Sequence, residues 1–142
     1  VNGSMPEYVV SRVADALNSV KKPINGSRVH LFGVAYKRDV NDMRESPALD
    51  VLELLVRRGA TVSYTDPHVP ELHEGAHRMS SVDAGAAFDG GCDCAVLTTD
   101  HSSFDYPRLA TLPLIVDTRN ALKDYRGSNI VRLEGLAHPL LA

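Results

Sequence analysis

The chain has 142 residues, 44% of them hydrophobic, which is enough for one buried core, so one domain is expected. Its net charge of −3 excludes a general electrostatic attraction to nucleic acid or to an anionic membrane. The longest apolar runs, such as "LPLIV" at 112–116, are far shorter than the roughly 20 residues that span a bilayer. We expect a soluble protein, and a cytoplasmic one because no charged-then-apolar leader opens the chain.

The first predicted elements are a helix and a strand. Apolar residues recur at helical spacing through residues 5–22, and Pro23 and the Asn25–Gly26 pair follow as stop signals. Residues 28–36 then form a mostly apolar run of strand length, which predicts a strand in the middle of a sheet.

Residues 46–59 carry the clearest helix signals. Ser46 is placed as the N-cap, Pro47 at the first helical position and Gly59 at the stop. Further on, we expect strands at 60–66, 77–81, 92–99, 112–117 and 129–135 (the last at an edge), short helices at 81–90 and 102–110, and a turn-rich loop at 66–75. This alternation predicts an α/β fold: a Rossmann-like open, mainly parallel sheet with helices on both faces, preceded by an N-terminal helix.

The two cysteines, Cys92 and Cys94, are two positions apart in a predicted strand, so both face the same side of the sheet. That placement does not favour a disulfide between them. Buried free thiols are expected, with metal or redox use as the alternative.

The connection over residues 33–51 is the candidate site, because ligands of open α/β sheets bind beyond the carboxyl ends of the strands. A dinucleotide loop would contain G-x-G-x-x-G, whereas this stretch has only Gly33, inside the predicted strand. It offers Lys37, Arg38 and Arg44 instead, interleaved with carboxylates. The pattern indicates anion recognition by side chains, or else a solvated loop that pairs its own charges.

Several stretches together resemble a known family: "GVAYKRDVNDMRESPALDVLELL", "GATVSYTDPHVP", "VDTRN" and the early "MPEYVVSRV". They are similar to the C-terminal domain of the UDP-glucose/GDP-mannose dehydrogenases, and the form "AYKxDVxDxRESP" is closer to members acting on UDP-N-acetylhexosamines. In that family an NAD-binding domain and a central helical dimerisation region with a cysteine nucleophile precede this domain. NAD there oxidises the C6 alcohol of the sugar to a uronate in two steps.

The resemblance implies a division of the chain and a set of site residues. Residues 1–25 would be a helix continuing from the central region, and residues 26–142 the UDP-binding domain. Tyr36, Lys37 and Arg119 would contact UDP, Arg44 would point toward the NAD side, and no catalytic residue is expected here.

It also implies partners and a limit on activity. The substrate would be a UDP-sugar for polysaccharide biosynthesis, NAD would be bound mainly by a domain absent from this sequence, and the parent enzyme would be a homodimer or larger through its central region. This chain would bind nucleotide without oxidising a sugar. The alternative is a stand-alone nucleotide- or NAD-binding module without oxidoreductase activity, such as a regulatory sensor.

A metal site is suggested by "HEGAH" at 73–77, which matches the zinc-hydrolase pattern H-E-x-x-H. That chemistry requires a helix that aims both histidines at one metal, yet a proline precedes the motif and a glycine interrupts it. We therefore expect no metal site, with incidental metal binding by His68, His73 and His77 as the remaining alternative.

Two further acidic positions have competing interpretations. Asp66 follows a predicted strand, where an acid of a Rossmann unit often binds the ribose of NAD, but a turn capped by its own side chain is the simpler explanation. The residue types of a hydrolase triad occur at Asp100, His101 and Ser102. A catalytic triad, however, is assembled in space and not from neighbours in sequence. We expect these three to be polar loop residues, some of them lining the nucleotide crevice.

Overall fold

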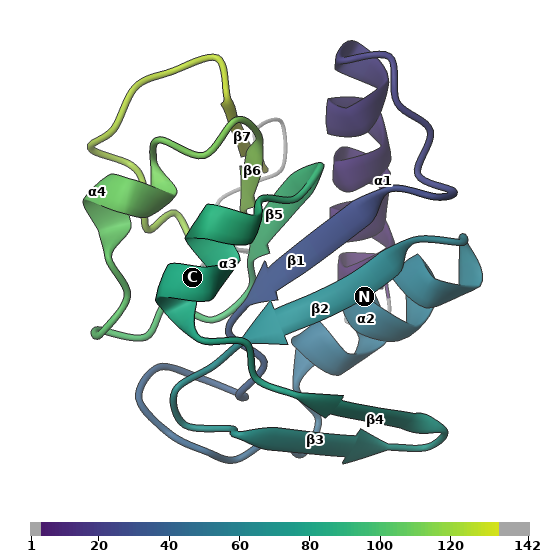
Figure 1. The fold of residues 1–142 in the computed structure, drawn as a ribbon, viewed down its shortest axis with the longest axis vertical. Helices are drawn as coiled ribbons and strands as arrows, with labels where there is room; N and C mark the ends of the chain where they lie inside the picture. Colours follow the sequence, from purple (N-terminus) through teal and green to yellow (C-terminus); the bar gives the residue numbers. More distant parts are fainter. Residues whose placement is uncertain (1–3, 134–142) are drawn as a thin grey trace.

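The computed structural model describes residues 4–133 of the chain (Figure 1). The helices are α1 (Ser4–Ser19), α2 (Pro47–Arg57), α3 (Ala84–Gly90) and α4 (Tyr106–Leu109). The strands are β1 (Arg28–Phe32), β2 (Thr61–Thr65), β3 (Glu71–Glu74), β4 (His77–Ser80), β5 (Cys94–Leu97), β6 (Ile115–Asp117) and β7 (Ile130–Arg132). Within this described part, no helix combines the length and the apolar character needed to cross a membrane.

The main sheet has five strands in the order β2-β1-β5-β6-β7, and every neighbouring pair is parallel. β7 lies at one edge, as predicted, and β1 lies inside the sheet between β2 and β5. From β1 the chain continues to α2, and from β5 it continues to α4 on the opposite face. The point between β1 and β5 is therefore a topological switch point, the place where ligands bind in such folds.

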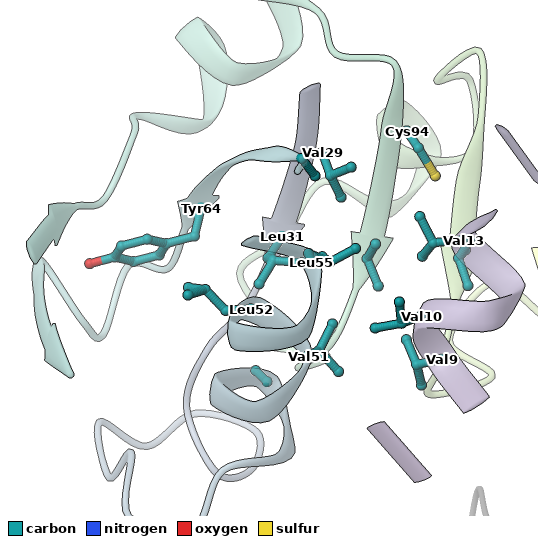
Figure 2. Close-up of a cluster of buried hydrophobic side chains, with 14 of the residues drawn as sticks. Val9, Val10, Val13, Val29, Leu31, Val51, Leu52, Leu55, Tyr64 and Cys94 are labelled. Carbon is teal, nitrogen blue, oxygen red and sulfur yellow. The ribbon is translucent and has the colours of Figure 1, made fainter. Parts of the chain in front are cut away.

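One face of the sheet is covered by α1 and α2, and Figure 2 shows their side chains meeting those of β1, β2 and β5. Leu17, Leu31 and Leu55 have no exposed surface, and burying a side chain of this size stabilises the fold by about 1.5–3 kcal/mol. The N-terminal helix is thus part of this core. A domain boundary near residue 25 stays a prediction.

The other face is covered by α3 and α4, as Figure 1 shows. Phe32, Leu97 and Ile115 of the sheet pack there with Leu109 of α4 and with Leu122. Helices on both faces of a parallel sheet confirm the predicted Rossmann-like α/β class.

Residues 71–80 form an antiparallel hairpin of β3 and β4, which lies outside the main sheet. Glu74 pairs with His77, so the "HEGAH" motif is the end of a hairpin and no helix aims its histidines at one metal. The prediction of a loop at 66–75 is wrong over 71–74, which form β3. Three of its four residues are exposed Glu or His, so the sequence lacks the apolar alternation that would predict a strand. Buried Leu72 is what this strand contributes to the core.

β1 ends at Phe32, four residues before the predicted end. The reason is Gly33, whose φ of +90° lies in the left-handed region and turns the chain out of the sheet. Gly33 is therefore the first residue of the connection and not part of the strand. Residues 134–135 of the last predicted strand, and the domain ends 1–3 and 134–142, lie outside the described residues.

The cysteines are free, as predicted. Cys94 is fully buried on β5, and burial raises the pKa of its thiol to about 12. Cys92 is half-buried, and burial also raises its pKa. Neither sulfur has the lowered pKa that a reactive thiolate requires.

His30 of β1 makes folding stability depend on pH. Its Nδ1 lies 2.7 Å from Ser63 Oγ and its Nε2 lies 2.7 Å from Thr65 Oγ1, and burial lowers the pKa of the ring from 6.5 to about 4. As the pH falls through 6.5, the unfolded chain therefore takes up a proton that the folded chain does not, so stability is lost between pH 6.5 and pH 4.

We expect this residue to account for a loss of about 2–3 kcal/mol between pH 7.5 and 4.5. Urea denaturation at the two pH values should show that loss in the unmodified protein in excess of the loss in His30→Gln, whose side chain does not titrate. Equal losses in the two proteins would contradict the assignment.

Candidate functional site

A pocket of about 550 Å³ lies beyond the carboxyl ends of β1, β5 and β6. Its walls come from four regions: the start of α1, the β1–α2 connection, the start of α2 and the residues that follow β5 and β6. The volume is typical of a small-molecule site. The lining residues are Met5, Pro6, Val9, Lys37, Arg38, Pro47, Ala48, Val51, Thr98, Asp100, Thr118 and Arg119.

The pocket carries three cations and one carboxylate. Asp100 Oδ2 lies 2.7 Å from Arg38 Nη2, and Asp100 Oδ1 accepts a hydrogen bond of 3.4 Å from Arg119 Nε. Lys37 is exposed and has no ion pair or hydrogen bond within residues 4–133. One carboxylate therefore orients two guanidinium groups, while the ammonium group stays available to an anion.

Arg119 is held by the turn that follows β6. Asp117 is buried at the end of that strand and accepts hydrogen bonds from the backbone N–H groups of Arg119, Ala121 and Leu122 at 2.8–3.2 Å. Thr118 donates its hydroxyl to Leu97 O, 2.7 Å away on β5. The backbone below the guanidinium group is therefore fixed before any ligand binds.

Asp66, at the end of β2, is fully buried, and both of its carboxylate oxygens are occupied. Oδ1 accepts from His68 N at 2.8 Å, so the predicted turn capped by its own side chain is confirmed. Oδ2 accepts from Val34 N and Ala35 N, at 2.8 and 3.1 Å, and from His101 Nε2 at 2.9 Å. Asp66 therefore binds the β1–α2 connection and leaves no oxygen for a ribose.

His101 is also fully buried, and its two ring nitrogens have different roles. Nδ1 accepts a hydrogen bond from Asp39 N at 2.8 Å, so the ring proton is on Nε2 and points to Asp66. Ser102 donates its backbone N–H and its hydroxyl to the Asp39 carboxylate, and these bonds lower the pKa of Asp39. Because the Ser102 hydroxyl bonds Asp39 and not His101, these residues do not form a triad.

Asp39, His68 and His101 are the one group at metal-ligand spacing in the described part of the chain, with ligand atoms within 4.8 Å of one another. A zinc ion would lie about 2.0–2.1 Å from the ring nitrogen. That position is blocked, since Asp39 N lies 2.8 Å from Nδ1 and points its proton at the lone pair. The geometry supports a hydrogen-bonded network and not a metal centre.

Of the four residues that the sequence places in the site, Lys37 and Arg119 line the pocket together. Tyr36 and Arg44 do not. The Tyr36 side chain is on the surface, with 48% of the residue exposed, and the Arg44 guanidinium lies 3.1 Å from Asp42. Arg44 thus pairs with a charge of its own loop, as the alternative interpretation predicts. Arg38 does not, because its partner Asp100 lies across the switch point, after β5.

Sequence reasoning missed Asp100 as a partner of two arginines, and it missed the contribution of α1 to the pocket wall. A usable signal was present in the polar residues directly after two parallel strands, "TTD" after β5 and "TRN" after β6. Both sets lie at the carboxyl edge of the sheet, where a ligand crevice is expected.

Comparison with known proteins identifies relatives over most of the chain. A family model described as "UDP-glucose/GDP-mannose dehydrogenase family, UDP binding domain" matches residues 30–124. A UDP-N-acetyl-D-mannosamine dehydrogenase from Methanococcus maripaludis is 35% identical, covering 87% of this chain and 29% of the relative. An NDP-N-acetyl-D-galactosaminuronic acid dehydrogenase from Ralstonia nicotianae is 32% identical, covering 84% and 28%. The chain thus spans less than a third of the length of these relatives.

Among solved structures, the UDP-D-ManNAc dehydrogenase of Pyrococcus horikoshii matches with a TM-score of 0.74 and 25% identity, covering 92% of this chain and 31% of that one. Several of these relatives are named for UDP-N-acetylhexosamines. This agrees with the residue pattern "AYKxDVxDxRESP" in the β1–α2 connection. The fold of this chain is therefore similar to that of the matching region of the Pyrococcus horikoshii protein.

Proposed function

This chain belongs to the UDP-glucose/GDP-mannose dehydrogenase family, as its UDP-binding domain, and we propose that it binds the UDP portion of a nucleotide sugar in the pocket lined by Lys37 and Arg119. The observation that carries the proposal is the ammonium group of Lys37, unpaired among the described residues, beside two guanidinium groups in a pocket at the switch point. A diphosphate supplies the negative charge that this pocket lacks.

The chemistry of each group suits that ligand. Lys37 can reach a phosphate as a point charge, and Arg119 can bind a phosphate edge through two N–H groups. The first turn of α2 lines the same pocket, and the positive end of its helix dipole favours an anion there. Tyr36, exposed next to Lys37, would contact the base or ribose at the mouth of the site.

We infer that the parent protein is an NAD-dependent UDP-sugar 6-dehydrogenase. Its substrate class would be the UDP-N-acetylhexosamines, because similar proteins bear the name UDP-N-acetyl-D-mannosamine dehydrogenase, with UDP-glucose as the wider alternative. NAD would accept the electrons removed at the sugar C6. We further infer a cytoplasmic enzyme of polysaccharide biosynthesis that forms a homodimer or larger assembly through a central region.

The residues of this chain do not by themselves fit an NAD site. The acid at the end of β2, Asp66, has no free acceptor for a ribose, and no glycine-rich loop follows β1. This disfavours the alternative of a stand-alone NAD-binding module. NAD would be held mainly by another domain, with Arg44, exposed just before α2, directed toward it.

Calorimetry with UDP tests the site through Lys37→Ala and Arg119→Ala. Each change removes a charge-assisted contact worth about 1.5–3 kcal/mol, so we expect UDP to bind roughly 10- to 100-fold more weakly. Lys123→Ala, which removes an exposed lysine outside the pocket lining, serves as the matched control and should leave binding unchanged. Unchanged affinity in both pocket variants would rule out the site.

A second assay tests the division of labour between domains. This chain, incubated with NAD and UDP-N-acetyl-D-mannosamine, should produce no NADH, because the proposed cofactor domain and cysteine nucleophile are not in its sequence. Turnover by the purified chain would contradict the proposal.

A further inference from the structure

Both ends of the segment Tyr36–Arg38 are attached to the same buried oxygen. On one side, Ala35 N donates directly to Asp66 Oδ2 at 3.1 Å. On the other side, Asp39 N donates to His101 Nδ1 at 2.8 Å, and His101 Nε2 donates to Asp66 Oδ2 at 2.9 Å. The loop that carries Lys37 is therefore an arch with two fixed ends, one direct and one through an imidazole ring.

The fixed end at Asp39 depends on His101 in a specific chemical form. The ring must be neutral with its proton on Nε2, since only then can Nδ1 accept from the backbone of Asp39. Asp39 has a φ of +61°, a left-handed conformation that non-glycine residues adopt at some energetic cost. Two hydrogen bonds hold it there: Asp39 N donates to His101 Nδ1, and Asp39 Oδ1 accepts from Ser102 N.

The support behind His101 is rigid. Tyr106 donates its hydroxyl to His101 O at 2.6 Å, and the ring packs edge-on against Phe104. The neighbouring residue Asp100 forms an ion pair with Arg38. The β5–α4 loop therefore holds the arch twice: the His101 ring accepts from the backbone of Asp39, and Asp100 pairs with the side chain of Arg38. Lys37 lies between the fixed ends at Ala35 and Asp39, and within residues 4–133 its ammonium group has no partner.

We propose that Asp66 and His101 form a latch that positions Lys37 for the diphosphate of the nucleotide, with His101 as a positioning residue. This inference rests on the proposed function. Neither latch residue lines the pocket, so the latch acts by restricting the arch before binding. This restriction lowers the entropy lost when Lys37 closes on a phosphate. Without it, the arch keeps its charge but loses its fixed shape.

Two substitutions of His101 separate the two halves of the latch. In His101→Gln, the amide N–H₂ replaces the Nε2 donor to Asp66, but no acceptor remains for Asp39 N. In His101→Asn, the amide oxygen takes the place of Nδ1 and accepts from Asp39 N, while the bond to Asp66 is lost. We expect UDP to bind at least 10-fold more weakly to the Gln variant, in which Asp39 N has lost its acceptor. We expect the Asn variant to bind within about 3-fold of the unmodified affinity, because Asp39 N keeps its acceptor and Tyr106 still holds the backbone of residue 101.

Calorimetry with UDP on the two variants gives distinguishable outcomes. Equal affinities in the Gln and Asn variants, whether both unchanged or both weakened, would overturn the latch. They would show that the hydrogen bond from Asp39 N, which only the Asn variant retains, does not affect UDP binding. If the unmodified chain does not bind UDP, the proposed function itself fails. His73→Gln, the same change at an exposed histidine of the β3–β4 hairpin, should bind like the unmodified chain.

NMR of the unmodified chain tests the latch without any variant. Imidazole ¹⁵N shifts should show His101 as the neutral Nε2–H form, and the Asp39 amide should exchange slowly with solvent. A proton on Nδ1, or a freely exchanging Asp39 amide, would overturn the proposal even if a His101 variant failed to fold.

Discussion

Asp66→Asn is expected to lower the free energy of unfolding by about 3 kcal/mol although it changes the side-chain volume very little. Four N–H groups donate to the two oxygens of this carboxylate, and Asp66 has no exposed surface through which water could replace them. In either orientation, the asparagine amide turns an NH₂ group toward at least one of those donors. Breaking a buried charged network of this kind typically costs 3–5 kcal/mol.

Urea denaturation at pH 7.5 measures this loss. Asp89→Asn makes the same chemical change at a carboxylate whose side chain is 79% exposed and pairs with Arg108, and there we expect a change within about 0.5 kcal/mol. A loss below 1 kcal/mol for Asp66→Asn would mean that the four hydrogen bonds contribute little to the fold.

The fold class followed from the sequence because local signals agreed with one another. α2 is the clearest case: Ser46 accepts a hydrogen bond from Ala48 N, Pro47 begins the helix, and its apolar stripe faces the core, all as the residue pattern predicts. The elements that were misplaced depend on contacts between distant segments. β3 exists because β4 pairs with it, and its own exposed residues do not have a strand pattern.

The site was predictable to the same extent. Lys37 and Arg119 follow parallel strands, and the geometry of parallel sheets brings the ends of such strands to one edge. The contacts of the neighbouring residues Arg38 and Asp39 were not predictable, because their partners Asp100 and His101 are 62 positions away in the chain. Their neighbourhood in sequence suggests a hydrolase cluster, whereas in space they are the support for the arch.

The absence of a glycine-rich loop after β1 has a structural counterpart. A glycine cradle binds phosphate through backbone N–H groups, but here Val34 N and Ala35 N are used to bind Asp66. Recognition of the ligand then depends on side chains, and side chains need an ordered backbone below them. The latch and the charged arch therefore both follow from the bonds of Val34 N and Ala35 N to Asp66. Gly33 turns the chain out of the sheet next to Thr99, whereas the glycines of a dinucleotide loop let the backbone approach a phosphate.

Gly33→Ala is expected to destabilise the fold by about 3–5 kcal/mol, the largest effect that we predict. An added Cβ would overlap Thr99 Cβ and lie 2.7 Å from Thr99 N, and backbone at the end of β5 cannot move aside as a flexible side chain can. The φ of +90° adds strain for any L side chain. Overpacking and backbone strain each cost about 1–3 kcal/mol, and here both act at the switch point.

Gly26→Ala separates the two contributions. Gly26 has nearly the same φ, +89°, but an added Cβ there would have no atom within 4 Å, so this variant reports backbone strain alone. We expect it to lose about 1 kcal/mol in urea denaturation, which leaves the rest of the Gly33→Ala loss to the contact with Thr99. Because the connections that follow β1 and β5 leave the sheet toward opposite faces at this contact, Gly33→Ala should also weaken UDP binding in the fraction that folds, whereas Gly26→Ala should not. Equal losses of stability in the two variants would show that strain, and not the approach of the two strand ends, requires glycine at position 33.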